Sequence, residues 1–186
     1  MKKEMPKLET ERLLLRFFEF SDAERVRELA GDREIADTTL NIPHPYEKGM
    51  AEEWISSHQI KFESGECVHF AIIVKATHEL IGAIGLMIDK GFNRAALGYW
   101  IGKEYWNKGY CTEAARAVLE YGFRQLFLHK ITSSHFTRNP SSGRVMRKIG
   151  MKKEGVFKEH VVKGDEYEDL VIYGILRKEW EEGNEY

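Results

Sequence analysis

Cysteine is scarce in this chain. The 186 residues contain only Cys67 and Cys111, and their spacing is not that of a metal site. Two isolated thiols exclude a disulfide framework and are typical of a reducing compartment. We therefore expect neither a structural disulfide nor a bound metal.

Long apolar runs and excess charge are also absent. The longest apolar run, 80–88, is too short to cross a bilayer, and residues 1–12 contain no apolar segment of the kind that a signal peptide needs. The formal net charge of −2 does not favour a protein that wraps nucleic acid. We therefore expect a cytoplasmic protein without membrane or nucleic-acid partners, folded as one domain over residues 1–186.

Two familiar phosphate-binding motifs are missing as well. No Gly-x-x-x-x-Gly-Lys-Ser/Thr loop occurs, and no Gly-x-Gly-x-x-Gly joins a strand to a helix. ATP and NAD are therefore not the expected ligands.

The most informative stretch that is present covers residues 94–128. Both faces of 95–101 are apolar, as in a central strand, and apolar residues from Ala115 to Leu126 then recur at helical spacing. The connecting loop, 103–112, contains Gly109, which permits a positive φ. Free N–H groups at the helix start would favour an anion such as a pyrophosphate, whereas an ordinary structural turn is the alternative interpretation.

The remaining pattern is that of a mixed α/β (α+β) protein. The proline-containing segment 41–46 cannot be helical, and it either lines a substrate cleft or forms a rigid surface loop. With the strand at 95–101, the other strands give a sheet of about six to seven strands flanked by helices. We expect these strands at 12–18, 68–74, 80–88, 130–137, 153–162 and 166–176, and further helices at 21–30, 47–62 and 141–149.

Two stretches resemble motifs of one superfamily. Residues 106–114, Trp-Asn-Lys-Gly-Tyr-Cys-Thr-Glu-Ala, resemble the acetyl-CoA pyrophosphate loop of the GNAT N-acetyltransferases. Residues 139–155 resemble that superfamily's segment Asn-x-x-Ser-x-x-x-x-x-Lys-x-Gly-Phe/Met-x-x-x-Gly, in the same order along the chain. Segments 8–16, 43–55 and 169–180 resemble the branch that contains the Rim-type N-terminal acetyltransferases of ribosomal proteins. The resemblance implies a single GNAT-like domain whose mixed, twisted sheet splays between two central strands to admit acetyl-CoA.

The resemblance also implies which residues would bind acetyl-CoA. The strand edge near Ile101 and Lys103 would pair with the pantetheine arm as another strand would. Asn139 would lie where the central strands separate and would bond the same arm. The pyrophosphate would be held by the backbone amides of Asn107, Lys108, Gly109, Tyr110, Cys111 and Thr112.

Ser142 would lie near the sulfur in the same scheme. Its hydroxyl could protonate the leaving thiolate after a neutral amine attacks the thioester, and capping of the following helix is the alternative role.

Three positions depart from the superfamily pattern. Trp106 stands where many members have Gln or Arg, Met146 where many have a tyrosine acid, and Ala96 where many have a glutamate base. His135 is then the nearest titratable candidate for a base, although a packed strand histidine is the alternative interpretation. Glu113 begins the helix, where a carboxylate favours the dipole for structural reasons.

A basic cluster follows Asn139 in the sequence. Lys148 is its member within the superfamily segment, and the cluster either meets the 3′-phosphate of CoA or forms a solvated helix face. Its members are Arg144, Arg147, Lys148, Lys152 and Lys153.

The resemblance and the missing base together predict an acetyl-CoA-dependent N-acetyltransferase that acts on a primary amine, most readily a protein or peptide N-terminus. The alternatives are a small-molecule (polyamine, antibiotic or amino acid) N-acetyltransferase, a non-catalytic acyl-CoA-binding module, and a nucleic-acid-binding protein that uses the basic cluster. We expect a monomer or a homodimer.

Overall fold

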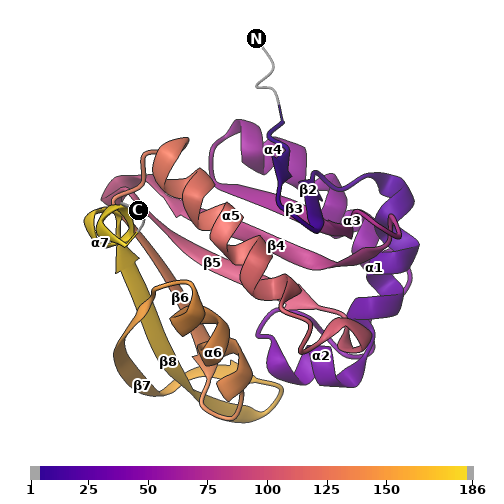
Figure 1. The fold of residues 1–186 in the computed structure, drawn as a ribbon. Helices are drawn as coiled ribbons and strands as arrows, with labels where there is room; N and C mark the ends of the chain where they lie inside the picture. The colour runs from indigo at the N-terminus through magenta and orange to yellow at the C-terminus, as the bar shows by residue number, and fades with distance from the viewer. Residues whose placement is uncertain (1–4, 184–186) are drawn as a thin grey trace.

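A computed structural model describes residues 5–183 and contains one mixed sheet of eight strands, ordered β1-β2-β3-β4-β5-β6-β8-β7 (Figure 1). Neighbouring strands are antiparallel except β5 and β6, which are parallel. The expected mixed α/β fold is confirmed, and the extra strand is the two-residue β1. The strands are β1 (Leu8–Glu9), β2 (Leu13–Arg16), β3 (Cys67–Val74), β4 (Leu80–Asp89), β5 (Arg94–Ile101), β6 (Lys130–Phe136), β7 (Lys152–Lys163) and β8 (Glu166–Leu176).

The helix expected at 47–62 is two helices, which is a correction to the sequence-based prediction. The Ser57 hydroxyl donates to the Trp54 carbonyl oxygen (2.8 Å), and this local bond competes with regular helical bonding. No helix within residues 5–183 is long and apolar enough to cross a membrane. The α-helices are α1 (Ala23–Ala30), α2 (Arg33–Thr38), α3 (Met50–Ser56), α4 (His58–Glu63), α5 (Tyr110–Arg124), α6 (Pro140–Lys148) and α7 (Arg177–Glu182), and the 3₁₀ turns are η1 (Phe20–Asp22), η2 (Lys90–Phe92) and η3 (Lys103–Tyr105).

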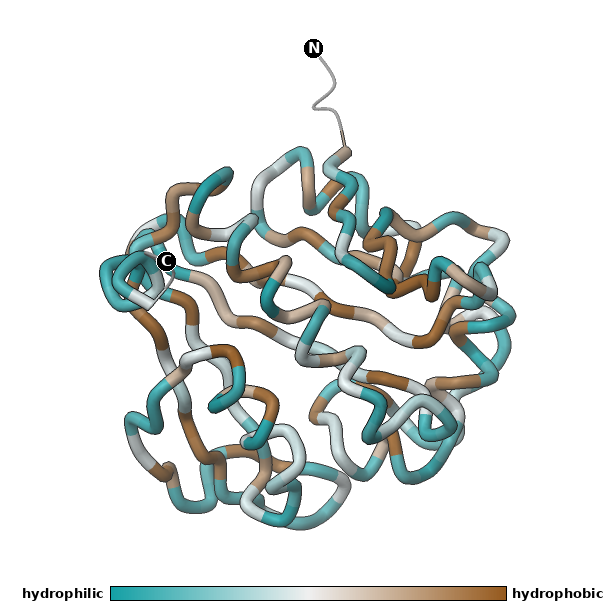
Figure 2. The backbone as a smooth tube through the Cα atoms, viewed as in Figure 1, coloured by the Kyte–Doolittle hydropathy of each residue, from teal (hydrophilic) through white to brown (hydrophobic). Residues whose placement is uncertain are grey.

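Helices cover both faces of the sheet (Figure 1). The apolar stripe of α5 includes Val118 and Leu119, which are buried in the main core together with Phe70 and Leu86. On the other face, α1 and α3 bury a second cluster that contains Ala71 and Ile73 of β3. Hydrophobic residues accordingly concentrate along the central strands, and hydrophilic ones lie towards the periphery (Figure 2).

The two central strands separate along their length. β5 and β6 pair only at Arg94–Ala96 with Lys130–Thr132, although β5 continues to Ile101 and β6 to Phe136. At the first position beyond this ladder, the Ser133 hydroxyl donates to the Leu97 carbonyl oxygen at 2.8 Å. The expected splay therefore begins here, and it leaves the far half of β5 without a neighbour on this side.

Candidate active site

A cavity of about 1290 Å³ occupies the splay. One part is lined by β5, the start of α5 and α6, and the other by segment 38–43, α3 and the ends of β6 and β8. Because Leu97 directs its carbonyl oxygen towards β6, the N–H and C=O of Tyr99 point the same way, where pairing has ended. An extended amide-containing chain could therefore pair with β5 from within the cavity.

The start of α5 presents a row of free amides to this cavity. The loop uses left-handed backbone at Asn107 (φ 60°) and Gly109 (φ 81°), and α5 begins at Tyr110. Within residues 5–183, no acceptor bonds the backbone N–H of any residue from 107 to 112; the first satisfied amide is that of Glu113, which donates to Gly109. Six consecutive free N–H groups at the positive end of a helix of 15 residues are suited to bind a phosphate or pyrophosphate.

Arg12 holds this loop from outside, and sequence reasoning did not identify it. Its guanidinium donates to the Lys108 carbonyl oxygen (3.0 Å), pairs with Glu113 (2.6 Å) and lies 4.6 Å from the centre of the Tyr110 ring. Burial opposes ionisation of Glu113, but hydrogen bonds from Thr10 and Arg12 outweigh it and lower the pKa of this carboxyl. Glu113 thus has the structural role expected from the sequence, and the pair fixes the loop with its Lys108 carbonyl turned away from the anion site.

Not every residue expected to touch the cofactor lines the cavity. Lys103 lies in η3, and its ammonium pairs with Glu34 at 2.8 Å. Lys108 is likewise not a lining residue. Ile101 does line the cavity, but its carbonyl oxygen accepts a hydrogen bond from the Trp106 indole (2.6 Å). Trp106 therefore closes the turn from β5 into the loop.

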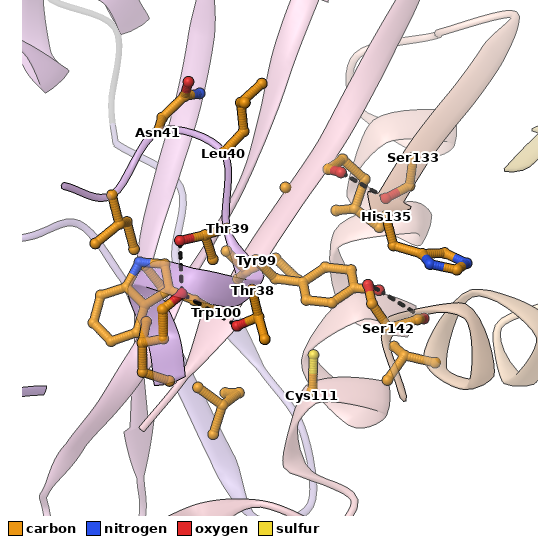
Figure 3. Close-up of a pocket in the computed structure, with 18 of the residues that line it drawn as sticks. Thr38, Thr39, Leu40, Asn41, Tyr99, Trp100, Cys111, Ser133, His135 and Ser142 are labelled. Carbon is orange, nitrogen blue, oxygen red and sulfur yellow. Dashed lines mark hydrogen bonds between the residues drawn. The ribbon is translucent and has the colours of Figure 1, made fainter. Parts of the chain in front are cut away.

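Asn139 and Ser142 lie together at the start of α6. The Asn139 side chain caps the helix by accepting from the Ser142 backbone N–H (3.4 Å), and its amide donates to the Thr38 carbonyl oxygen (3.4 Å). Asn139 is thus the capping residue, and the Ser142 hydroxyl is not used as a cap. The Ser142 hydroxyl oxygen instead lies 2.8 Å from the Tyr99 hydroxyl oxygen (Figure 3). Sequence reasoning did not single out Tyr99.

Tyr99 extends from β5 towards α6, with the Cys111 thiol beside it (Figure 3). Burial raises the pKa of the Tyr99 phenol far above its usual value, and burial also raises the pKa of Cys111 to about 12. Both groups are therefore neutral at physiological pH. Because both faces of its strand are apolar in the sequence, only the tertiary contact with Ser142 reveals the role of the Tyr99 hydroxyl.

His135 lines the cavity but is held by its own surroundings. Its Nδ1 lies 2.8 Å from the Phe136 carbonyl oxygen, and the ring faces Tyr173 with centroids 5.7 Å apart. Its Nε2 lies against Gly143 of α6, where a Cβ would come within 2.5 Å. This is the environment of a packed strand histidine.

The segment after α2 lines one side of the cavity. Arg138 donates to the Asp37 carbonyl oxygen (2.5 Å), and Lys163 donates to the carbonyl oxygens of Leu40 (3.2 Å) and Ile42 (2.6 Å). Residues 40–43 and Tyr46 then line the cavity. Of the two interpretations of segment 41–46, the structure favours the cleft-lining one.

Two histidines pack against each other here, His69 within the cavity wall and His58 behind it. His58 is 4% exposed, both of its ring nitrogens lack a partner among residues 5–183, and its ring centre is 4.7 Å from that of His69. Burial lowers the pKa of His58 to about 3 and that of His69 to about 4. Both imidazoles are therefore neutral at pH 7. Neither binds a second proton in the pH range where an amine loses its own, so both are weak bases there.

The lowered pKa values predict loss of stability on acidification. Between pH 6.5 and about 3 the unfolded chain binds protons that folded His58 and His69 do not, so stability falls with falling pH in this window. Each such group contributes up to about 1.4 kcal/mol per pH unit. We expect His58→Phe, which keeps the ring contacts with Phe18 and Trp54, to reduce this slope by roughly that amount in urea unfolding at pH 7 and pH 5. An unchanged slope would contradict the assignment.

Comparison with known proteins agrees with this geometry. A family model described as "Acetyltransferase (GNAT) domain" matches residues 12–152. The chain is 38% identical over 171 residues to the uncharacterized N-acetyltransferase YnaD of Bacillus subtilis, covering 92% of this chain and 97% of that protein. It is 24% identical over 189 residues to the [ribosomal protein uS5]-alanine N-acetyltransferase of Escherichia coli, covering 95% and 94%.

A solved structure gives the same fold. The crystal structure of a GNAT-family acetyltransferase from Bacillus anthracis superimposes with a TM-score of 0.83 at 32% identity, covering 93% of this chain and 99% of that one. The chain belongs to the GNAT family of N-acetyltransferases.

Proposed function

We propose that this N-acetyltransferase transfers the acetyl group of acetyl-CoA to the α-amine of a peptide or protein N-terminus. The free amides of residues 107–112 suit the pyrophosphate, and the unpaired edge of β5 around Tyr99 suits the amides of the pantetheine arm. In this proposal the thioester lies near Ser142. The polar groups present therefore fit acetyl-CoA as the acyl donor.

The chemistry asks little of the protein beyond positioning. A neutral amine attacks the thioester carbonyl carbon, the carbon–sulfur bond breaks, and the sulfur leaves with the electron pair. Ser142 is the proposed hydrogen-bond donor to that sulfur, because its hydroxyl lines the cavity and is not used as a helix cap. His135 is the weaker candidate, since its Nδ1 already meets a backbone carbonyl oxygen.

The proposal of an N-terminal α-amine as the acceptor rests on one observation: the described residues of the cavity wall include few groups that could act as a base. Ala96 lines the cavity where a glutamate base would stand, and His69 has a pKa of about 4. Glu53 is the only carboxylate among the described lining residues, whereas Lys61 and Arg138 line the same side. A site without a strong base suits an α-amine, which is already partly neutral near pH 7.5, better than a lysine.

The same set of lining residues argues against a polyamine as the acceptor. A polyamine carries several positive charges and is recognised by carboxylates, but the described wall supplies Glu53 alone. The test is CoA release measured with peptides that have free N-termini, the same peptides with acetylated N-termini, spermidine, aminoglycosides and free amino acids. We expect release with free N-termini only, and release chiefly with spermidine would overturn the proposal.

Only some members of the basic cluster line the cavity in the structure. This selects the residue that we expect to contact the 3′-phosphate of CoA. Arg144 and Lys148 line the cavity, whereas Arg147 donates to the Tyr173 hydroxyl (3.0 Å) and Lys152 pairs with Glu179 (2.7 Å). A charge-assisted bond from Lys148 to the 3′-phosphate would be worth about 1.5–3 kcal/mol. Dephospho-CoA should therefore bind about tenfold or more weakly than CoA in calorimetry.

The two lysines of this cluster make a matched pair for the same measurement. Lys148→Met should remove the difference between CoA and dephospho-CoA, and Lys152→Met should retain it. Equal affinity of the wild type for CoA and dephospho-CoA would show that Lys148 does not contact the 3′-phosphate.

A further inference from the structure

The hydroxyl groups of Tyr99 and Ser142 form a hydrogen-bonded pair in the wall of the cavity. Their oxygens are 2.8 Å apart, and the Tyr99 oxygen is also 3.1 Å from the Ser142 carbonyl oxygen. Both residues line the cavity, so the pair faces the space where the thioester is expected (Figure 3). Met146, at the position where many relatives have a tyrosine, is fully buried and has no hydrogen to donate.

The pair offers two hydroxyl hydrogens, and their arrangement decides what Ser142 can do. If Tyr99 donates to the Ser142 carbonyl oxygen, the serine hydroxyl must donate its hydrogen to the Tyr99 oxygen. That hydrogen is then not available to a group in the cavity. If Tyr99 donates to the Ser142 hydroxyl oxygen, the serine hydrogen is free to point into the cavity. No other partner of that hydroxyl exists within residues 5–183. A negative charge that develops on a nearby sulfur favours the second arrangement.

We infer that Tyr99 is a positioning residue for acetyl transfer: its hydroxyl donates to the Ser142 hydroxyl oxygen and so aims the serine hydrogen at the leaving sulfur. The inference rests on the proposed function. As the carbon–nitrogen bond forms, the carbon–sulfur bond breaks and the thiolate leaves with both electrons. The amine releases one proton to solvent, the thiolate later takes one from water, and both hydroxyl groups end as they began.

The surroundings of Tyr99 suit this role. Its phenol is neutral throughout the range in which an enzyme is assayed, because burial raises its pKa. The neighbouring Cys111 thiol is neutral as well, so no charge competes for the hydroxyl hydrogen. The donor strength of the pair should therefore not change with pH, and loss of Tyr99 should lower kcat equally at every pH.

The test combines Tyr99→Phe, Ser142→Ala and the double variant. Tyr99→Phe should lower kcat about tenfold while leaving the KM and calorimetric Kd for acetyl-CoA unchanged. Because Tyr99 acts only through Ser142, the double variant should be no slower than Ser142→Ala alone. Tyr121→Phe is the matched control, since Tyr121 is a buried tyrosine on α5 outside the cavity wall.

Two results would overturn the inference while leaving the proposed function intact. One is an active wild type with Tyr99→Phe at full kcat, and the other is losses in Tyr99→Phe and Ser142→Ala that multiply in the double variant. A wild type that binds no CoA or releases none with any amine would overturn both.

Discussion

Gly109→Val should abolish binding of acetyl-CoA. Gly109 has φ +81°, a conformation that a β-branched residue adopts only with strain, and a Cβ there would lie 3.4 Å from the Arg12 guanidinium. The strained backbone would also displace the amides of residues 107–112, which must approach the pyrophosphate closely. Loss of these bonds should weaken binding at least about a hundredfold, and calorimetry with the wild type and the variant measures it.

A second glycine separates strain from cofactor binding. Gly164 also has a positive φ (+63°), and no atom lies within 4 Å of a Cβ added there. It joins β7 to β8 and does not line the cavity. Gly164→Val should therefore lower the melting temperature through backbone strain but keep the wild-type affinity. Wild-type affinity for acetyl-CoA in Gly109→Val would show that this loop does not bind the cofactor.

The rate should follow the protonation state of the acceptor amine. With no strong base in the described wall, kcat/KM for a peptide α-amine of pKa about 7.7–8.0 should rise about 35- to 50-fold from pH 6 to pH 8 through one apparent pKa. At pH 7.5 about a third of such an amine is neutral, against about one part in 800 for a lysine of pKa about 10.4. The α-amine should therefore be preferred by roughly two orders of magnitude.

Two variants show whether a protein group sets that pKa. In His135→Asn the new amide can still donate to the Phe136 carbonyl oxygen, as Nδ1 does in the wild type. Glu53→Gln removes the one carboxylate of the described wall. Neither change should shift the midpoint of the pH profile, and loss of most activity in either would identify an enzyme-borne base.

Local sequence signals predicted the functional unit closely. The strand expected at 95–101 is β5 (Arg94–Ile101), and the helix indicated by the apolar spacing from Ala115 to Leu126 is α5 (Tyr110–Arg124). Both follow from hydrophobic periodicity and one glycine, which depend on residues close in the chain. The start of the loop was less predictable, because η3 is a short 3₁₀ turn whose Lys103 pairs with the distant Glu34.

What the sequence could not show are contacts between distant segments. Arg12 reaches Lys108 across 96 positions, and Tyr99 reaches Ser142 across 43. Strand alternation assigns Arg12 and Tyr99 only to a face, because it carries no information on which helix covers that face. The helices α2 and α7 were also not predicted, since each has only six residues and too few turns for periodicity to register.

The central claim is acetyl transfer from acetyl-CoA to an N-terminal α-amine, and one product analysis tests it most directly. The protein would be incubated at pH 7.5 with acetyl-CoA and a peptide that carries one free α-amine and one internal lysine, and fragment mass spectrometry would locate the acetyl group. The account predicts acetylation at the α-amine with the lysine free. Acetyl on the lysine side chain, or an unmodified peptide, would contradict it.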